Sequence, residues 1–318
     1  MQHFRNILVG IELANADHQA EFVLTPPNEE ALRRAIWLAA HTQGRLTIFS
    51  AVDISETARA MLEEEPEHAA GEYSREAFDF LERYVARAKA QGVEAVQKLA
   101  IGTPWLEICR QVVCDAHDLV VIGTRNLGQI GRILFGSTGV KLLRNCPCPV
   151  WITRPDPNWD DLNILVPSDL TEVSLEALRI AVNGGQLVDT RLHLLHAVEG
   201  MCAPPPWFGK TQRKMVNDFL AQERAEATRR LHEQLSFTDY RTLPKGVQVH
   251  VVDGPPDEAI LKAIDDFQID LVVMGTAGSS GLSGFVVGTT AERLVSHMKC
   301  SVIAVKPAGF HCHVERAR

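Results

Sequence analysis

An internal repeat is the feature that most limits the folds open to this sequence. Residues 119–142, LVVIGTRNLGQIGRILFGSTGVKL, align without a gap with residues 271–294, LVVMGTAGSSGLSGFVVGTTAERL, at an offset of 152 residues. The same offset pairs Asp118 with Asp270 just before each segment. Self-similarity at a fixed offset indicates that one structural unit occurs twice. The chain is therefore expected to fold as two related domains.

The repeat continues towards the start of each copy, with insertions of different length. NILVGIE from Asn6 matches NILVPSD from Asn163 at an offset of 157, whereas ALRRAI from Ala31 matches ALRIAV from Ala177 at 146. The first copy therefore carries 11 additional residues between its first strand and its first helix. They fall within residues 14–28, a polar stretch with two prolines near its end that predicts a loop.

Length and composition agree with two ordinary globular domains. A chain of 318 residues is long enough for two domains, each with a core of its own. Hydrophobic residues make up 46% and charged residues 23%, which is typical of globular proteins. Pro155, Pro157 and Asn158 punctuate the junction between the copies. We therefore place the two domains at residues 1–156 and 157–318.

Short apolar runs alternate with segments of helical periodicity in both copies, which predicts an α/β fold. Strands that alternate with helices form parallel βαβ units with right-handed crossovers. The strands expected in the first copy are residues 6–12, 45–52, 94–100, 119–122 and 149–153. Those expected in the second copy are residues 163–168, 191–198, 247–252, 271–274 and the SVIAVK segment.

A glycine-rich stretch joins a strand to a helix in the second copy. Four glycines follow the strand 271–274 within ten residues, and Gly288, Thr289 and Thr290 precede a helical pattern. A helix start presents unpaired N–H groups and the positive end of the helix dipole, so this arrangement suits a phosphate group. It matches neither a P-loop nor a G-x-G-x-x-G dinucleotide turn. A flexible surface loop before a capped helix is the alternative interpretation.

Together these motifs resemble the universal stress protein family. The matching features are the strand ILVPSD that ends in an acid, a G-x-P turn, the segment DLVVMG and the pattern G-x2-G-x9-G-T. In the second copy that pattern is complete as Gly275, Gly278, Gly288 and Thr289. Two copies in one chain resemble the tandem class of the family. The resemblance implies two Rossmann-like, doubly wound domains with five-stranded parallel sheets, packed as an intramolecular pseudo-dimer.

The resemblance implies that ATP binds in the second copy, in the crevice beyond the strand ends. Asp169 matches the acid that contacts the nucleoside, and Val198 matches the position whose backbone faces adenine. The ribose and phosphate loop corresponds to Gly275, Gly278, Gly288, Thr289 and Thr290, and the neighbouring walls to Pro167, Ser168 and Met274. Any Mg²⁺ is expected to be held by the phosphates and water. A turn acid that begins a helix is the alternative role of Asp169.

The first copy departs from the family pattern at two positions. Glu12 replaces the usual Asp, and Asn126 replaces the second glycine of the motif. An Asn side chain occupies space where a phosphate would approach. The other matching residues are Val52, Gly123, Gly136, Ser137 and Thr138. Whether this site is weakened, or is compensated by the additional glycines of the loop, stays open at this point.

Charge and hydropathy argue against several classes of partner. A net charge of −8 and a pI near 5.8 disfavour nucleic acid and anionic membranes. No apolar run approaches the length of a membrane span, and the N-terminus lacks a leader pattern, so we expect a cytoplasmic protein. An arginine finger, a P-loop lysine and a catalytic dyad are all missing, so we expect no enzyme, or at most slow ATP hydrolysis.

Cysteine and aromatic residues outside these motifs have two interpretations each. Seven cysteines in a chain of this size suit reduced thiols. Cys146 and Cys148 flank a proline, as a redox or metal pair or as buried structural thiols. The tail residues His311, Cys312 and His313 invite a metal hypothesis, with a disordered terminus as the alternative. Trp207 is expected to cap a ligand pocket or to anchor a proline-rich loop.

The sequence thus predicts a tandem nucleotide-binding stress protein that acts as a nucleotide-dependent regulator of stress response and survival. The alternative is a stress scaffold that binds partners and no nucleotide, which Glu12 and Asn126 favour for the first copy. An adenine-nucleotide hydrolase of similar fold would need an S-G-G-x-D-S loop, and SDLTEVS lacks it. Pairing of the two domains within the chain is expected, and a homodimer is compatible with it.

Overall fold

The computed structural model describes residues 4–15, 22–52, 69–124, 136–155, 159–199, 207–276, 294, 297–310, 312 and 314. These residues form two compact α/β units that divide between Asp156 and Pro157. The described residues of the C-terminal tail, Phe310, Cys312 and Val314, belong to the first unit. The sequence analysis had assigned this tail to the second domain.

The first unit is built on a parallel sheet of five strands in the order β7, β6, β1, β4, β5. The central strand β1 pairs with β4 on one side and with β6 on the other. Strand order therefore reverses at β1, and a crevice forms beyond the carboxyl ends of such neighbouring strands. The strands are β1 (Asn6–Gly10), β4 (Arg45–Val52), β5 (Glu94–Ile101), β6 (Leu119–Gly123) and β7 (Val150–Thr153).

Four helices cover this sheet among the described residues. Helix α1 contacts β1, β4, β6 and β7, α3 packs along β5, and α4 contacts both α5 and β4. Their apolar faces contribute to a core in which every residue of β1 is buried. The helices are α1 (Pro26–Thr42), α3 (Ala69–Ala90), α4 (Pro104–Asp115) and α5 (Ser137–Asn145).

The loop predicted for residues 14–28 is partly wrong. Helix α1 already begins at Pro26, because proline at the first positions of a helix removes no intrahelical hydrogen bond. The segment before it contains an antiparallel pair, β2 (Ala14–Asn15) and β3 (Phe22–Val23). Phe22 is buried, and its ring lies 5.7 Å from that of Phe80 in α3. Apolar packing therefore orders part of the insertion that is specific to the first copy.

The second unit has the same design, with a parallel sheet in the order β10, β9, β8, β11, β12. Its central strand β8 pairs with β9 and β11, as β1 pairs with β4 and β6. The strands are β8 (Asp161–Pro167), β9 (Asp189–Val198), β10 (Val247–Asp253), β11 (Leu271–Gly275) and β12 (Ser301–Val305). The helices are α6 (Glu172–Gly185), α7 (Lys210–Ser236), a 3-10 turn (Tyr240–Thr242) and α8 (Pro256–Asp266).

The repeat is visible at the level of single hydrogen bonds. In the first unit the carboxylate of Asp118 accepts a hydrogen bond from the backbone N–H of Asn6 at 3.0 Å. In the second unit Asp270 accepts the equivalent bond from Asn163 at 2.8 Å. Each bond fastens the start of the central strand to the turn before its neighbour. The α/β class with parallel sheets is confirmed, whereas the pseudo-dimer packing stays a prediction.

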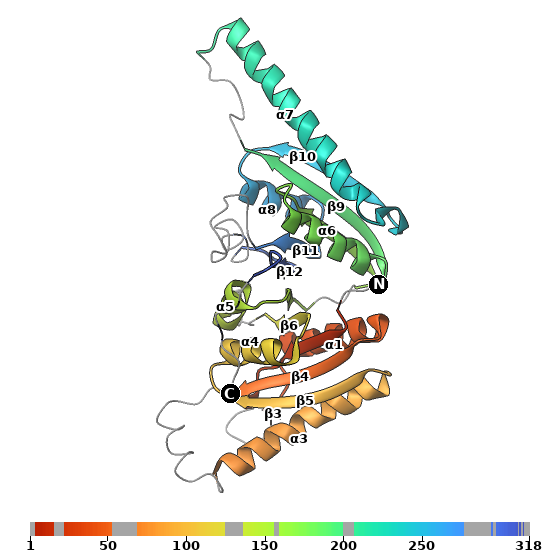
Figure 1. The fold of residues 1–318 in the computed structure, drawn as a ribbon, viewed down its shortest axis with the longest axis vertical. Coiled ribbons are helices and arrows are strands. Elements are labelled where there is room, and N and C mark those ends of the chain that lie inside the picture. Colours follow the sequence, from red (N-terminus) through yellow and green to blue (C-terminus); the bar gives the residue numbers. More distant parts are fainter. Residues whose placement is uncertain are drawn as a thin grey trace. The chain divides into compact units, whose positions relative to one another are not determined.

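Helix α7 lies along β9 and β10 (Figure 1), and only its C-terminal part is buried. Its buried residues begin at Leu220, although the helix begins at Lys210. Trp207, just before the helix, is 80% exposed. The prediction that Trp207 anchors the proline-rich loop is therefore wrong, since an anchor would be buried. No helix in the described part of the chain combines the length and apolar character of a membrane span.

Candidate functional site

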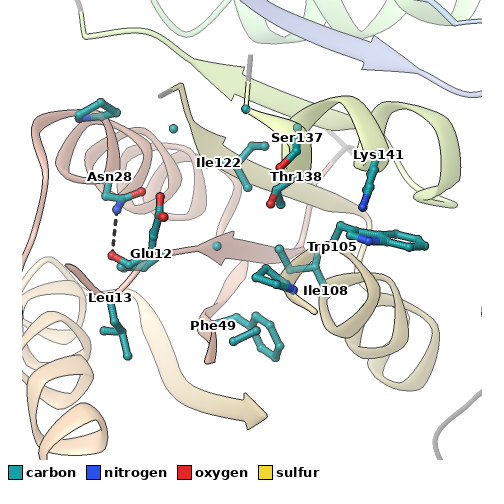
Figure 2. Close-up of a pocket in the computed structure, with 18 of the residues that line it drawn as sticks. Glu12, Leu13, Asn28, Phe49, Trp105, Ile108, Ile122, Ser137, Thr138 and Lys141 are labelled. Carbon is teal, nitrogen blue, oxygen red and sulfur yellow. Dashed lines mark hydrogen bonds between the residues drawn. The ribbon is translucent and has the colours of Figure 1, made fainter. Parts of the chain in front are cut away.

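A cavity of about 730 Å³ lies in the first unit beyond the carboxyl ends of β1, β4 and β6 (Figure 2). Its volume is in the range of pockets that hold small molecules. The cavity is lined by all six residues that the sequence assigned to this copy: Glu12, Val52, Gly123, Gly136, Ser137 and Thr138. The strand topology therefore brings the candidate residues of the first copy together around one space.

One side of the pocket is formed by the start of α5. Gly136 is the N-cap residue, and Ser137 and Thr138 of the first turn line the cavity. The backbone N–H groups of a first helical turn have no partner within the helix and carry the positive end of its dipole. Such a surface binds phosphate groups without any cationic side chain.

A lysine adds positive charge to the same side. Lys141 lies one turn after Thr138 in α5 and also lines the pocket. Its ammonium nitrogen is 5.5 Å from the ring centroid of Trp105, within the range of a cation–π contact. Trp105 follows the first residue of α4 and lines the pocket as well. The aromatic ring thus holds the lysine at the pocket wall.

The opposite side of the pocket carries the acid. Figure 2 shows Glu12 beside Asn28, away from Lys141 and Trp105. The side-chain amide of Asn28 donates a 3.1 Å hydrogen bond to the backbone oxygen of Glu12. This bond fixes the chain where it leaves β1, while the Glu12 residue itself is exposed. The pocket therefore separates a carboxylate from a positively charged surface.

Packing requires the glycine at the end of β6. A Cβ atom placed on Gly123 would lie 2.5 Å from the backbone oxygen of Pro27 and 2.6 Å from its carbonyl carbon. Real Cβ atoms do not approach a backbone so closely. Gly123 was assigned to the ribose and phosphate loop, which stays a prediction, and the structure shows that it lets the start of α1 contact the sheet.

The sequence candidates for this pocket did not include several of its lining residues, among them Asn28, Phe49, Trp105 and Lys141. Lys141 could have been found, because it lies three residues after Thr138 and so shares its helix face. Trp105 directly follows the Gly-Thr-Pro turn, which also placed it near the strand ends. Asn28 could not be found, since it falls in the segment that was interpreted as a loop.

The second unit presents the equivalent edge of its sheet. Parallel strands β9, β8 and β11 are neighbours, so their carboxyl ends meet at one edge. The described candidate residues at this edge are Pro167, Ser168, Asp169, Val198, Met274 and Gly275. The remaining candidates Gly278, Gly288, Thr289 and Thr290 lie outside the described residues. Their role in ligand binding stays a prediction.

Asp169 forms the turn that was the alternative explanation for an acid at this position. Its carboxylate accepts hydrogen bonds from the backbone N–H and the hydroxyl of Thr171, at 3.2 and 2.5 Å. Thr171 is the N-cap of α6, so Asp169 supports the start of that helix. The residue is nevertheless exposed, which leaves its carboxylate accessible from the crevice edge.

Ser168 has a structural role that the sequence did not indicate. Its hydroxyl donates a 2.8 Å hydrogen bond to the side chain of Gln234 in α7 and accepts one from the backbone N–H of Leu170. Ser168 is 5% exposed. Its side chain therefore fastens α7 to the end of β8.

A pair of histidines, one buried and one half-buried, connects β9 and β10 in the second unit. The Nδ1 atom of His193 lies 3.1 Å from Nε2 of His250, and the His193 ring stacks on Phe267 at 4.7 Å. His193 is 3% exposed. Burial, and then the neighbouring His250, lower the pKa of His193 from 6.5 to about 4. Burial also lowers the pKa of His250.

These pKa shifts predict that the second unit loses stability in acid. Between pH 6.5 and 4 the unfolded chain binds a proton at His193 and the folded chain does not, so stability present above pH 6.5 is lost as the pH falls. At about 1.4 kcal/mol per pKa unit, the loss reaches about 3 kcal/mol. Urea unfolding of the second unit at pH 7 and pH 4.5 measures it. His193→Gln should flatten this dependence, and an equal dependence in both proteins would contradict the assignment.

A model of the universal stress protein family matches residues 3–154 and again residues 162–306. The chain belongs to the universal stress protein family. Each of the two matches covers one copy of the repeat, so the family and its tandem arrangement, both predicted from the sequence, are confirmed.

Similar proteins share this organisation over their full length. The chain is 24% identical to universal stress protein E of Photorhabdus laumondii, with 100% of both chains covered. It is 26% identical to universal stress protein E of Escherichia coli K12, over 94% of this chain and 98% of that protein.

Solved structures of low identity share the fold. A functionally unknown protein from Pseudomonas aeruginosa PAO1 superposes with a TM-score of 0.69 at 20% identity, over 96% of this chain and 93% of that one. A universal stress protein from Archaeoglobus fulgidus superposes with a TM-score of 0.62 at 17% identity, over 95% and 98%. At these identities the likeness describes the fold alone.

Proposed function

We propose that this protein is a stress-response regulator that binds ATP or a related adenine nucleotide in each of its two domains. The observation that carries the proposal is the pocket of the first unit, in which one side offers a helix N-terminus with Lys141 and the other a carboxylate. In the second domain the support is the complete glycine motif of the sequence, which makes that domain the principal site.

The two sides of the pocket suit the two ends of a nucleotide. The phosphates would lie against the first turn of α5, where the N–H groups and Lys141 provide positive charge. The ribose hydroxyls would donate to the carboxylate of Glu12. Adenine would pack against the end of β4, beside Val52 and the buried Phe49. Any Mg²⁺ would be bound by the phosphates and water.

Lys141 supports binding in the first domain despite the change in its motif. Asn126, which replaces the second motif glycine, lies outside the described residues. A cationic side chain at the phosphate end strengthens charge-assisted contacts that the altered loop would weaken. The equivalent position in the second copy is Arg293, so both sequences place a cation there.

This arrangement is suited to binding rather than to rapid turnover. Phosphoryl transfer requires groups that position the attacking water and neutralise charge on the transferred phosphate. In the described pocket Lys141 is the cationic side chain, and it lies on the wall beside Trp105. We infer that partner proteins respond to whether nucleotide is bound. We also propose that the protein is cytoplasmic and that its two domains pair within the chain.

Replacing Lys141 should weaken nucleotide binding in the first domain. Loss of a contact to a charged phosphate costs about 1.5–3 kcal/mol, which is roughly tenfold or more in Kd. Isothermal calorimetry with MgATP measures it, in a Gly278→Trp background that blocks the second domain. The expected result is a Kd that rises roughly tenfold or more for Lys141→Gln.

Arg144→Gln is the matched control for this experiment. Arg144 is exposed in the last turn of the same helix and does not line the pocket, yet its replacement changes the net charge equally. Its Kd should stay unchanged. If both variants weakened nucleotide binding equally, the cause would be a general charge effect. If neither variant weakened it, Lys141 would not contact the ligand.

The alternative function is a scaffold that binds partner proteins without nucleotide. The feature that favours it is Glu12. Its carboxylate would repel the phosphates of a nucleotide that bound with its phosphates on the Glu12 side of the pocket. A protein that releases no nucleotide on denaturation and gives no heat with MgATP would support this alternative.

A further inference from the structure

An aromatic side chain lies at the phosphate end of the pocket in the first unit. Trp105, the second residue of α4, lines the pocket and is half-buried. Helix α4 packs on α5, whose first turn forms the side of the pocket that suits phosphates. Figure 2 shows Ser137 and Thr138 between Glu12 on one side and Trp105 on the other. The phosphate surface therefore separates the indole ring from the acid.

ATP bound as proposed above offers no group to this ring. Adenine would lie at the end of β4 and the ribose at Glu12, so the phosphate chain would end on the side of Trp105. A phosphate makes no favourable contact with the face of an indole, because that face is negative. In a pocket of about 730 Å³, the ring therefore borders a part that ATP would leave unfilled.

Lys141 makes this part of the pocket suitable for a phosphate that is followed by a base. Its ammonium nitrogen, 5.5 Å from the ring centroid of Trp105, can pair with a phosphate beside the ring. Aromatic side chains stack on bases of any type, since every base has a π-face. A cation next to an aromatic ring thus matches the last phosphate and the base of a second nucleoside.

The second copy of the repeat differs at this position. At the offset of 152 residues, Lys141 aligns with Arg293, whereas Trp105 aligns with Asp257. Asp257 lies in the first turn of α8, the counterpart of α4. A carboxylate repels phosphates and has no face on which a base can stack. The pairing of a cation with an aromatic ring is therefore specific to the first domain.

The cysteine residues of the first unit provide no comparable site. The Sγ atoms of Cys146 and Cys148 lie 3.6 Å apart, and both residues are buried, which fits structural thiols. Among the described residues no group of three or more His, Cys, Asp or Glu side chains is arranged to hold a metal ion. His311 and His313 lie outside those residues.

We propose that the first domain binds a dinucleoside polyphosphate, with the second base stacked on Trp105, whereas the second domain binds a mononucleotide. The proposal rests on the nucleotide binding proposed above and specifies the class of nucleotide. Its support is the position of the half-buried ring beyond the start of α5, the lysine beside that ring, and the acid at the equivalent position of the second copy.

Calorimetric titration in the Gly278→Trp background, in which the first domain is the site expected to remain, tests the proposal. Diadenosine tri-, tetra- and pentaphosphate are each compared with adenosine that carries the same number of phosphates. The compound without the second base carries more negative charge at its end, so tighter binding of its diadenosine partner reports the base and not the charge. Stacking predicts a Kd about tenfold lower for the best-fitting diadenosine compound.

Trp105→Leu should bring the two Kd values of that pair together, whereas Trp105→Phe, which keeps an aromatic ring, should retain the difference. The ratio separates stacking from a structural role, because loss of packing or of the position of Lys141 would weaken both compounds equally. Trp37→Leu is the matched control. Trp37 is also half-buried in the first unit, but it belongs to α1 and does not line the described pocket, so this variant should keep the ratio.

Equal Kd values within every pair would overturn the proposal and leave nucleotide binding in the first domain intact. A ratio that Trp105→Leu leaves unchanged would also overturn it, because the second base would then bind elsewhere. If neither member of any pair bound to the folded protein, nucleotide binding by the first domain would itself be contradicted, and the proposal would fall with it.

Discussion

Glu30→Ala should lower the free energy of unfolding of the first unit by about 3 kcal/mol. Arg34 is 1% exposed, and its Nε atom donates a 2.5 Å hydrogen bond to the carboxylate of Glu30, which also accepts from Arg33. Removing the carboxylate takes away the charge that the buried guanidinium of Arg34 pairs with on α1. Breaking a buried ion pair from one side is far more costly than the net value of the pair.

Glu29→Ala is the control for this prediction because it removes the neighbouring carboxylate. Glu29 pairs with Arg87 of α3, and both side chains are about two-fifths exposed. An exposed ion pair contributes less than about 1 kcal/mol. Hydrogen exchange of α1 peptides in the full chain measures both variants, since it reports local stability even when two units unfold separately. Equal losses in protection would contradict the buried pair.

Gly123→Ala should destabilise the first unit by about 3 kcal/mol and distort its pocket. The new Cβ would lie 2.5 Å from the backbone oxygen of Pro27, so the start of α1 or the end of β6 must move. Both segments line the pocket, so ligand binding should fail together with stability. The measurement is urea unfolding combined with hydrogen exchange of the α1 and β6 peptides.

Gly139→Ala provides the contrast within the same pocket. A Cβ atom at Gly139 would meet Ile122 and Ile152 at 3.5 Å, which is ordinary van der Waals contact. Alanine is also the better helix former by up to about 1 kcal/mol, so this variant should be neutral or stabilising. Similar losses in both variants would show that the close contact at Gly123 is not what limits substitution. Because a Cβ atom at Gly123 already meets Pro27, a variant with a larger residue there would disrupt packing and could not report on ligand binding alone.

Most of the fold could be predicted from the sequence, because the same alternation of apolar strands and amphipathic helices occurs in both copies of the repeat. The strands expected at residues 45–52 and 271–274 agree closely with β4 and β11. The errors occur where tertiary contacts, rather than the local sequence, determine the secondary structure. Phe22 packs on Phe80 and orders part of an insertion that local composition describes as a loop.

The candidate site was predicted less completely, because a motif identifies backbone positions rather than the side chains that surround them. The glycines and hydroxyl residues at the start of α5 were found, since the phosphate geometry depends on local sequence. Trp105 and Phe49 belong to α4 and β4, and they line the pocket because the strand order brings these elements next to β1 and β6. Spacing in the sequence does not show such long-range contacts.

The central claim is that each domain binds an adenine nucleotide, and calorimetric titration of the intact, ligand-free chain with MgATP tests it most directly. The account predicts two sites in the wild-type protein. In Gly278→Trp one site should remain, and it should be weakened further by Lys141→Gln. The absence of binding heat, with no nucleotide released when the protein as purified is denatured, would contradict the account.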